Sequence, residues 1–155
     1  MQLRELTEAE LGAVQAMIER CRDHYLLASG AGPKPTAARD VWDRLPDDMP
    51  RSAKLTLGVF EDGLVGIADV VRGWPRAETW LIGLLLLNPA ARGRGVGAHV
   101  VGHIDAEAAG AGAERLHVAV LRANVRGLAF WRRLGFADVP TSRKSAIVLE
   151  RAVVR

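Results

Sequence analysis

Residues 92–97 carry the clearest chemical signal of this sequence. They run Arg-Gly-Arg-Gly-Val-Gly, with glycine at every second position from Gly93 to Gly97. Glycine allows a sharp turn and a close approach of the backbone to a ligand because it has no Cβ. A helical pattern follows, and a helix start offers unpaired N–H groups and the positive end of its dipole. With the charges of Arg92 and Arg94, this glycine loop predicts an anion site, most naturally for phosphate or pyrophosphate.

A buried strand is expected directly before the glycine loop. Four consecutive leucines, Leu84 to Leu87, end at the turn signal Asn88-Pro89. A continuous apolar run bounded by a turn is typical of a strand that is covered on both faces. We therefore expect a central strand over about Thr79 to Leu87, followed by the loop and a helix.

Spacing separates three kinds of phosphate-binding loop. A nucleoside-triphosphate loop needs four residues between its glycines and then Gly-Lys-Ser or Gly-Lys-Thr, which this sequence lacks. Residues 93–98 do fit the loose dinucleotide pattern Gly-x-Gly-x-x-Ala, and Arg122 follows the next strand, where it could contact a phosphorylated ribose. That fold places the motif near the start of a larger sheet, whereas only one strand–helix–strand unit follows here. A nicotinamide-nucleotide-binding oxidoreductase is the weaker alternative.

Taken as Arg-x-x-Gly-x-Gly, residues 92–97 resemble the pyrophosphate loop of the GNAT superfamily of N-acetyltransferases, which bind acetyl-coenzyme A. The preceding residues 85–89 look like the central strand of that family. About thirty residues further on, Asn124 precedes the run 129–136, Ala-Phe-Trp-Arg-Arg-Leu-Gly-Phe. This is similar to the second signature of the family, an asparagine, a short helix and a Gly-Phe pair. The resemblance spans roughly residues 61–136.

The resemblance implies where acetyl-coenzyme A would bind as cosubstrate. A backbone N–H of the central strand, at Leu86 or Leu87, would stabilise the oxyanion formed from the thioester. Four arginines could hold the 3′-phosphate or simply form a solvated helix face: Arg122, Arg126, Arg132 and Arg133. The residues implied in cofactor binding are Leu85, Leu86, Leu87, Arg92, Gly93, Arg94, Gly95, Val96, Gly97, Asn124, Phe130, Trp131 and Arg133.

One position departs from the family pattern. The family usually has a tyrosine where this chain has Trp131, and that tyrosine is the usual proton donor to the leaving thiolate. Indole has a single N–H donor and no useful acidity near neutral pH. The general acid is therefore vacant or supplied elsewhere, which keeps open a non-catalytic coenzyme A-binding sensor module as an alternative to an enzyme.

The implied reaction is direct transfer of an acetyl group to a primary amine in a ternary complex. Such a reaction requires a base for the amine proton and donors for the oxyanion. Glu78 is the preferred base because it lies where the chain enters the central strand; Asp69, His24 and Tyr25 are the other candidates. The aromatic residues expected to bind the acceptor are Tyr25, Trp74 and Trp80.

Several chemically suggestive residues have ordinary explanations. His99 and His103 stand four apart on one helix, but no third ligand is evident, so we predict no metal site. Cys21 lies on the apolar face of the first helix and is expected to be a buried thiol. His117 alternates with the core residues of its strand and is expected to face away from them without a catalytic role.

Composition indicates one soluble enzyme domain over residues 1–155. Of these residues, 49% are hydrophobic and 25% are charged, as in an ordinary globular protein. The single cysteine excludes an internal disulfide and favours a reducing compartment, most simply the cytoplasm. We expect no signal peptide and no membrane segment. The net charge of +3 comes from dispersed arginines, so no nucleic-acid partner is expected. The expected partner is a small-molecule or peptide amine, and a homodimer is allowed.

Helical and strand patterns alternate along the chain as the resemblance requires. They indicate an α/β fold with a mixed, mostly antiparallel sheet, two helices on each broad side, and strands that splay after the central strand. A capping box at residues 7–10 should open the first helix. The expected strands are 2–6, 55–59, 64–71, 79–87, 116–120 and a last antiparallel pair formed by 136 onward and 145–151; the expected helices are 7–25, 35–45, 96–110 and 125–134.

Overall fold

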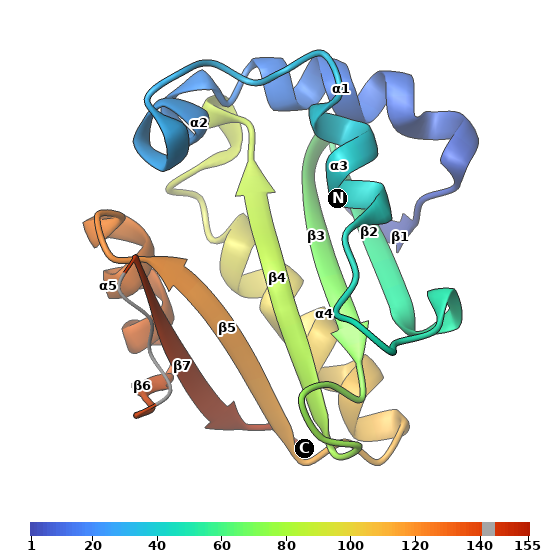
Figure 1. Ribbon diagram of the computed structural model, residues 1–155, viewed down its shortest axis with the longest axis vertical. Helices are drawn as coiled ribbons and strands as arrows, with labels where there is room; N and C mark the ends of the chain where they lie inside the picture. The colour runs from blue at the N-terminus through green and yellow to red at the C-terminus, as the bar shows by residue number, and fades with distance from the viewer. Residues whose placement is uncertain (141–144) are drawn as a thin grey trace.

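The fold is a seven-stranded sheet with helices on both faces, seen in a computed structural model that describes residues 1–140 and 145–155 (Figure 1). Neighbouring strands are antiparallel except for one parallel pair, β4 with β5. In sheet order, the strands are β1 (Gln2–Glu5), β2 (Lys54–Phe60), β3 (Leu64–Arg72), β4 (Thr79–Leu87), β5 (Arg115–Leu121), β7 (Ala146–Ala152) and β6 (Ala137–Asp138).

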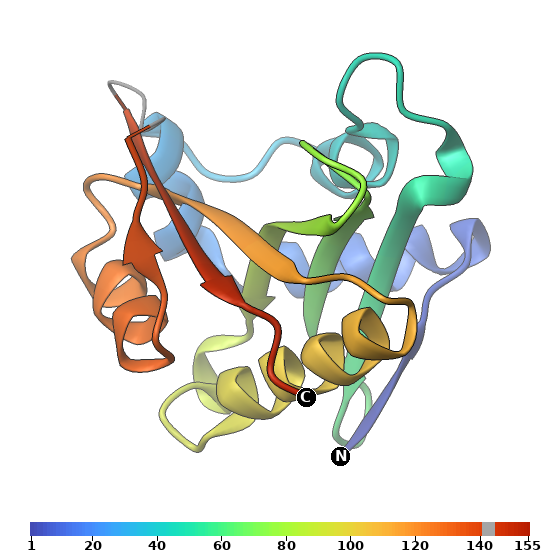
Figure 2. The same ribbon diagram turned by 90° about the horizontal axis from the view of Figure 1, so that it is seen from below.

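The helices form a layer on each side of the sheet (Figure 2). Helices α1 and α3 pack on β2, β3 and the end of β4, whereas α4 and α5 pack on the opposite face and form the larger core. The helices are α1 (Leu11–Glu19), α2 (Arg22–Ser29), α3 (Ala37–Asp43), α4 (Val96–Gly110) and α5 (Val125–Arg133), with short 3-10 turns at Glu8–Glu10, Arg51–Ala53 and Pro89–Ala91.

The mixed, mostly antiparallel fold is confirmed, but the first predicted helix is divided. The capping box is present, yet it opens a 3-10 turn before α1. After Glu19 the backbone tightens, because Arg20 and Cys21 donate to carbonyls three residues back. Buried Cys21 also contacts the Leu87 carbonyl through its Sγ, at 3.4 Å. The chain bends at this anchor, and α2 begins at Arg22.

A bulge at Gly83 changes which side chains of β4 reach each core. Ile82 pairs with Val70 and Leu84 pairs with Asp69, so Gly83 is an extra residue in β4. Before the bulge, Ile82 packs in the core under α4 and α5; after it, Leu84 packs toward α1 and α3. A Cβ at position 83 would lie 3.3 Å from the Asp69 carboxylate, so any larger residue would crowd Asp69.

The predicted splay is present between β4 and β5. The two strands pair only where Thr79–Ile82 meets Arg115–Val118. Both strands continue, to Leu87 and Leu121, and in the described structure these later residues do not pair with each other. We call this region, beyond Ile82 and Val118, the splay.

Candidate active site

Backbone groups of β4 are aimed into the splay by the register of the sheet. Asn88 donates its N–H to the Val65 carbonyl at 2.7 Å, which fixes the hydrogen-bonding alternation between β3 and β4. Leu86 therefore bonds to β3, whereas the N–H groups of Leu85 and Leu87 face away from β3, toward β5. Of the two predicted oxyanion donors, only Leu87 has an N–H directed to the splay.

The glycine loop follows β4 and ends at the start of α4. Gly93 and Gly95 have φ of 74° and 79°, the left-handed region that favours glycine. Gly95 is the N-cap of α4 and has no side chain to cap it, so the first-turn N–H groups are available to an anion. Gly97 packs on α5, because a Cβ there would lie 3.0 Å from the Phe130 ring. These contacts place the loop between β4, α4 and α5.

Both arginines of the loop are paired with carboxylates. The two Nη atoms of Arg92 donate to the Asp23 carboxylate on α2, and its Nε donates to the Leu87 carbonyl at 2.9 Å. The hydrogen bond from Arg92 lowers the pKa of Asp23 below its ordinary value. Arg94 pairs with Glu61 at 2.8 Å. Arg92 thus ties the loop to α2, a contact with Asp23 that the sequence did not indicate.

The second motif forms α5 and its connection to β6. Asn124 caps α5 by accepting the Gly127 N–H at 2.9 Å. Trp131, only 5% exposed, lies in the core under α4 and α5, edge-on to Phe130 and Phe136 with ring centroids 5.0 Å apart in each pair. Its position accounts for a large aromatic side chain by packing alone. Arg133 is exposed at the end of α5.

Glu78 lies away from the glycine loop. It precedes β4, so it stands at the opposite end of this strand from the loop. At about 3.3 Å per residue, it is roughly 16 Å before Gly83, where the splay begins. Its backbone carbonyl accepts from Glu114 at 2.7 Å and so closes the turn into β5. The structure does not bring the preferred base to the splay.

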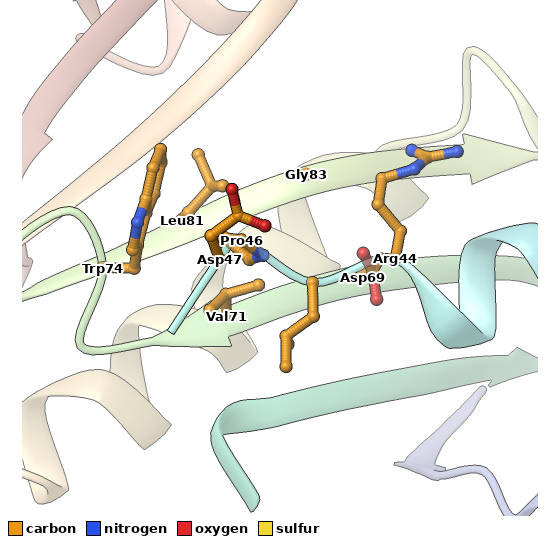
Figure 3. A pocket seen from close by; sticks show the side chains of 9 residues that line it. Arg44, Pro46, Asp47, Asp69, Val71, Trp74, Leu81 and Gly83 are labelled. Atoms are coloured by element: carbon orange, nitrogen blue, oxygen red, sulfur yellow. The ribbon is translucent and has the colours of Figure 1, made fainter. Parts of the chain in front are cut away.

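A hollow of about 450 Å³ opens over the bulge of β4, on the face that also carries α1 and α3 (Figure 3). One end is apolar and aromatic, with Trp74 beside Leu81, and the other end carries Asp69 and Arg44. Asp47 projects between them. The lining residues are Arg44, Leu45, Pro46, Asp47, Asp69, Val71, Trp74, Leu81 and Gly83.

The three predicted acceptor-binding aromatics are not brought together. Trp74 lines the hollow. Trp80, 4% exposed, belongs to the core on the opposite face of the sheet. Tyr25 packs on the core under α1 and α3, and its ring meets that of His24 edge-on at 5.2 Å. Burial raises the pKa of Tyr25 and lowers that of His24.

Asp69 is held in a buried ion pair at the floor of the hollow. Lys54 Nζ, whose side chain is 0% exposed, lies 2.8 Å from Asp69 Oδ1 and also donates to the carbonyls of Val41 and Arg44. Burial raises the pKa of Asp69 and lowers that of Lys54. With its carboxylate occupied by Lys54, Asp69 anchors the end of α3 to β3.

His117, for which the sequence predicts no catalytic role, contacts a carboxylate on the face of the sheet that carries the hollow. His117 Nε2 is 2.7 Å from Glu150 Oε2, and Arg115 Nη2 is 2.9 Å from the other oxygen. His117 was expected to face away from the core, and it does. The alternation of apolar residues in each strand predicts on which face of the sheet a side chain lies. Only the pairing of β5 with β7 shows that His117 and Glu150 are neighbours.

Neither a metal cluster nor a membrane-spanning helix is found among the described residues. His99 and His103 remain a pair on α4, and within residues 1–140 and 145–155 no three His, Cys, Asp or Glu side chains gather as metal ligands. Over the same ranges, each helix is too short or too polar to cross a bilayer.

Known acetyltransferases resemble this chain in sequence and in fold. The sequence model described as the acetyltransferase (GNAT) family matches residues 15–136. An acetyltransferase from Thermus thermophilus superposes with a TM-score of 0.81 at 23% identity, over 97% of this chain and 96% of that one. The PaiA N-acetyltransferase from Thermoplasma acidophilum, solved in complex with coenzyme A, gives 0.74 at 18%, over 97% and 98%. The ribosomal-protein-S18-alanine N-acetyltransferase from Escherichia coli gives 0.71 at 13%, over 99% and 94%.

Proposed function

Because this chain belongs to the GNAT acetyltransferase family, which uses acetyl-coenzyme A, we propose that it transfers the acetyl group directly to a primary amine in a ternary complex. The observation that carries this proposal is the splay, where the Leu85 and Leu87 N–H groups of β4 have no strand partner on β5 among the described residues, next to a glycine loop and an uncapped helix start. The amine would belong to a small molecule or a peptide.

The residues around the splay fit acetyl-coenzyme A. The glycine loop and the first turn of α4 would hold the pyrophosphate, with Arg94 free to exchange Glu61 for phosphate. The Leu87 N–H would bond to a carbonyl of the pantetheine arm as it leads away from the loop. The Leu85 N–H, which also faces the splay and lies nearer to the hollow, would then stabilise the oxyanion. When bound, the thioester supplies the acetyl group and a good leaving group.

The proposed reaction can proceed with tryptophan at position 131, although its side chain is not an acid. A thiol leaves as a fairly stable anion, since a cysteine side chain has a reference pKa of about 8.5, so a dedicated acid helps less than it would for an alkoxide. Water or a backbone donor would then protonate the departing sulfur. Trp131 would contribute shape by holding Phe130 against Gly97.

A coenzyme A sensor is the second candidate, and the burial of Trp131 favours it. At the position where the family usually has its tyrosine, this chain has a core residue without an acidic proton. The dinucleotide alternative loses its support, because its fold needs a mainly parallel sheet, and here β4 with β5 is the one parallel pair among the described strands.

A ligand screen followed by an activity assay tests the proposed function. Thermal unfolding with acetyl-coenzyme A, coenzyme A, NADPH and ATP should show stabilisation by the first two, as mass action requires of ligands that bind the native state. Release of free thiol from acetyl-coenzyme A should then depend on an added amine. Stabilisation without turnover across the amine panel would favour the sensor, and stabilisation by NADPH alone would contradict both.

A further inference from the structure

His117 carries an imidazole on the face of β5 that points away from the larger core, and the proposed function leaves it without a role. Its side chain is 17% exposed and its Nε2 lies 2.7 Å from Glu150. In the described structure, the core under α1 and α3 takes its strand residues from β2, β3 and β4, and none from β5 or β7. Ala119, two residues further on the same face, is exposed. His117 can therefore be reached by a ligand.

The register places His117 at the edge of both the hollow and the splay. Leu81, which lines the hollow, is its direct partner on β4, and paired residues of neighbouring strands project from the same face. Strands lie about 4.8 Å apart, so the backbone of His117 stands one strand spacing from Leu81 in the wall of the hollow, and its ring reaches toward Glu150 on β7. The splay begins one residue later, after Ile82 and Val118.

Glu150 determines which nitrogen of the neutral imidazole ring carries the proton. Desolvation alone would raise the pKa of Glu150, but hydrogen bonds from His117 and Arg115 outweigh it and hold the pKa below its ordinary value. The ionised carboxylate only accepts hydrogen bonds, so the neutral ring carries its proton on Nε2. The lone pair is then on Nδ1. The other charged groups on this side are Arg115 beside Glu150 and Asp47, Arg44 and Asp69 around the hollow.

We propose that His117 is the general base that takes the proton of the acceptor amine, and that Glu150 is the positioning residue that fixes its tautomer. The hollow over Gly83 is then the acceptor site, with Trp74 and Leu81 beside the non-reacting part of the amine. This inference rests on the proposed acetyl transfer. It replaces Glu78, which stands outside hydrogen-bond reach of the splay.

The proton and bond changes balance without another reactant. One proton passes from the substrate ammonium to His117 Nδ1, and the neutral nitrogen attacks the thioester carbonyl. The C–N bond forms, the C–S bond breaks, and the sulfur leaves as thiolate. The second nitrogen proton passes to the sulfur, directly or through water, and the imidazolium returns its proton to solvent. The products are the amide, the free thiol and one proton.

The experiment measures thiol release from acetyl-coenzyme A by the full chain between about pH 5 and 8, the range in which an ordinary histidine side chain changes charge. The amine probes are phenethylamine, spermidine, a lysine peptide and a peptide with a free N-terminus. His117→Ala should lower kcat by about 100-fold or more, with the coenzyme A affinity unchanged. Added imidazole should restore part of the rate and its acid limb, which a purely structural role would not allow. Glu150→Gln should cause a smaller loss.

Controls separate catalysis from folding. His103→Ala, on α4 away from this face, should keep the wild-type rate. His117→Gln retains a hydrogen-bond partner for Glu150 but cannot take a proton, so it serves if His117→Ala does not fold. A folded His117→Gln protein with the wild-type rate would overturn the base assignment, as would a rate loss confined to Glu78→Gln. Absence of turnover by the wild type with every amine would instead reject the acetyl transfer, and the base with it.

Discussion

At the scale of single residues, the backbone conformation at Gly95 explains the need for glycine better than a lack of space for a side chain does. A Cβ at Gly95 would meet nothing within 4 Å, yet the φ of 79° disfavours any other residue. The same residue begins α4, where an anion would approach the N–H groups most closely. The conformation and the approach of the ligand therefore depend on one residue.

Gly95→Val should abolish stabilisation by coenzyme A. A β-branched residue is a clear outlier at positive φ, and its side chain would project where phosphate must approach. The matched control is Gly102→Ala, an exposed position in the middle of α4 with open space around it. It should keep coenzyme A binding and raise stability by about 0.5–1 kcal/mol. Thermal shifts with and without coenzyme A measure both, and an undiminished shift for Gly95→Val would exclude the loop as the site.

Trp131 variants should separate packing from acid catalysis. Trp131→Ala should destabilise the protein by about 3–5 kcal/mol, because the indole fills the core beside Phe130 and Phe136. Trp131→Phe should keep most activity, since a large aromatic remains. Trp131→Tyr is decisive for function: a rate increase of about tenfold or more at equal cofactor affinity would show that an acid is missing, and would favour the sensor. Denaturant unfolding and turnover give the two readouts.

At the scale of secondary-structure elements, two polar contacts hold segments that the apolar pattern alone does not position. The capping box fixes the turn before α1, where Glu10 accepts from the Thr7 N–H at 2.8 Å and from Arg4 at 2.7 Å. The buried pair of Lys54 and Asp69 joins the end of α3 to the bulged region of the sheet.

The capping box should make stability depend on pH in the acid range. Hydrogen bonds from Arg4 and from the Thr7 backbone lower the pKa of Glu10 to about 2. Because the folded pKa is lowered, the contribution is complete above the unfolded value of about 4.3 and is lost as the pH falls from there toward 2. The stability difference between wild type and Glu10→Gln should therefore be present at pH 7 and shrink below pH 4.3. Glu107→Gln, exposed on α4, should show no such trend in urea unfolding.

Breaking the buried pair should be costly. Asp69→Asn leaves the Lys54 charge buried without its counter-ion and should destabilise the protein by about 3–5 kcal/mol. Asp47→Asn, exposed at the same hollow, should change stability by less than about 0.5 kcal/mol. Should Asp69→Asn fail to fold, the double variant Lys54→Met with Asp69→Leu should recover a folded protein. Equal urea midpoints for Asp69→Asn and wild type would contradict this account.

At the scale of the whole molecule, the sequence predicted the layers better than the pairings. The strands, the helix of the glycine loop and the splay follow from apolar patterns and from the resemblance to the family. The division between α1 and α2 could not be predicted in this way, because the bend at Cys21 depends on a contact with Leu87, which is distant in the sequence. Likewise, Arg92 looks like a phosphate ligand in sequence, and its pairing with Asp23 appears only in space.

The site was predicted unevenly for the same reason. Local motifs specify the loop that would hold the cofactor, since the glycines act through their own backbone. The proposed acceptor site takes its residues from β3, β4, β5, β7 and the segment after α3, so no single sequence motif contains it. The sequence favours Glu78 as the base because it stands next to the central strand, but a strand extends about 3.3 Å per residue, so Glu78 lies away from the splay.

The alternating backbone of β4 has a consequence for exchange kinetics. Leu86 gives its amide proton to β3, whereas Leu85 and Leu87 direct theirs into the splay, where β5 offers no partner. In deuterated water, the amide protons of Leu85 and Leu87 should exchange quickly and that of Leu86 slowly, an alternation that NMR resolves residue by residue. Bound coenzyme A should remove this alternation by protecting the amides of Leu85 and Leu87. Uniform protection in the free protein would mean that the strand has another partner on that side.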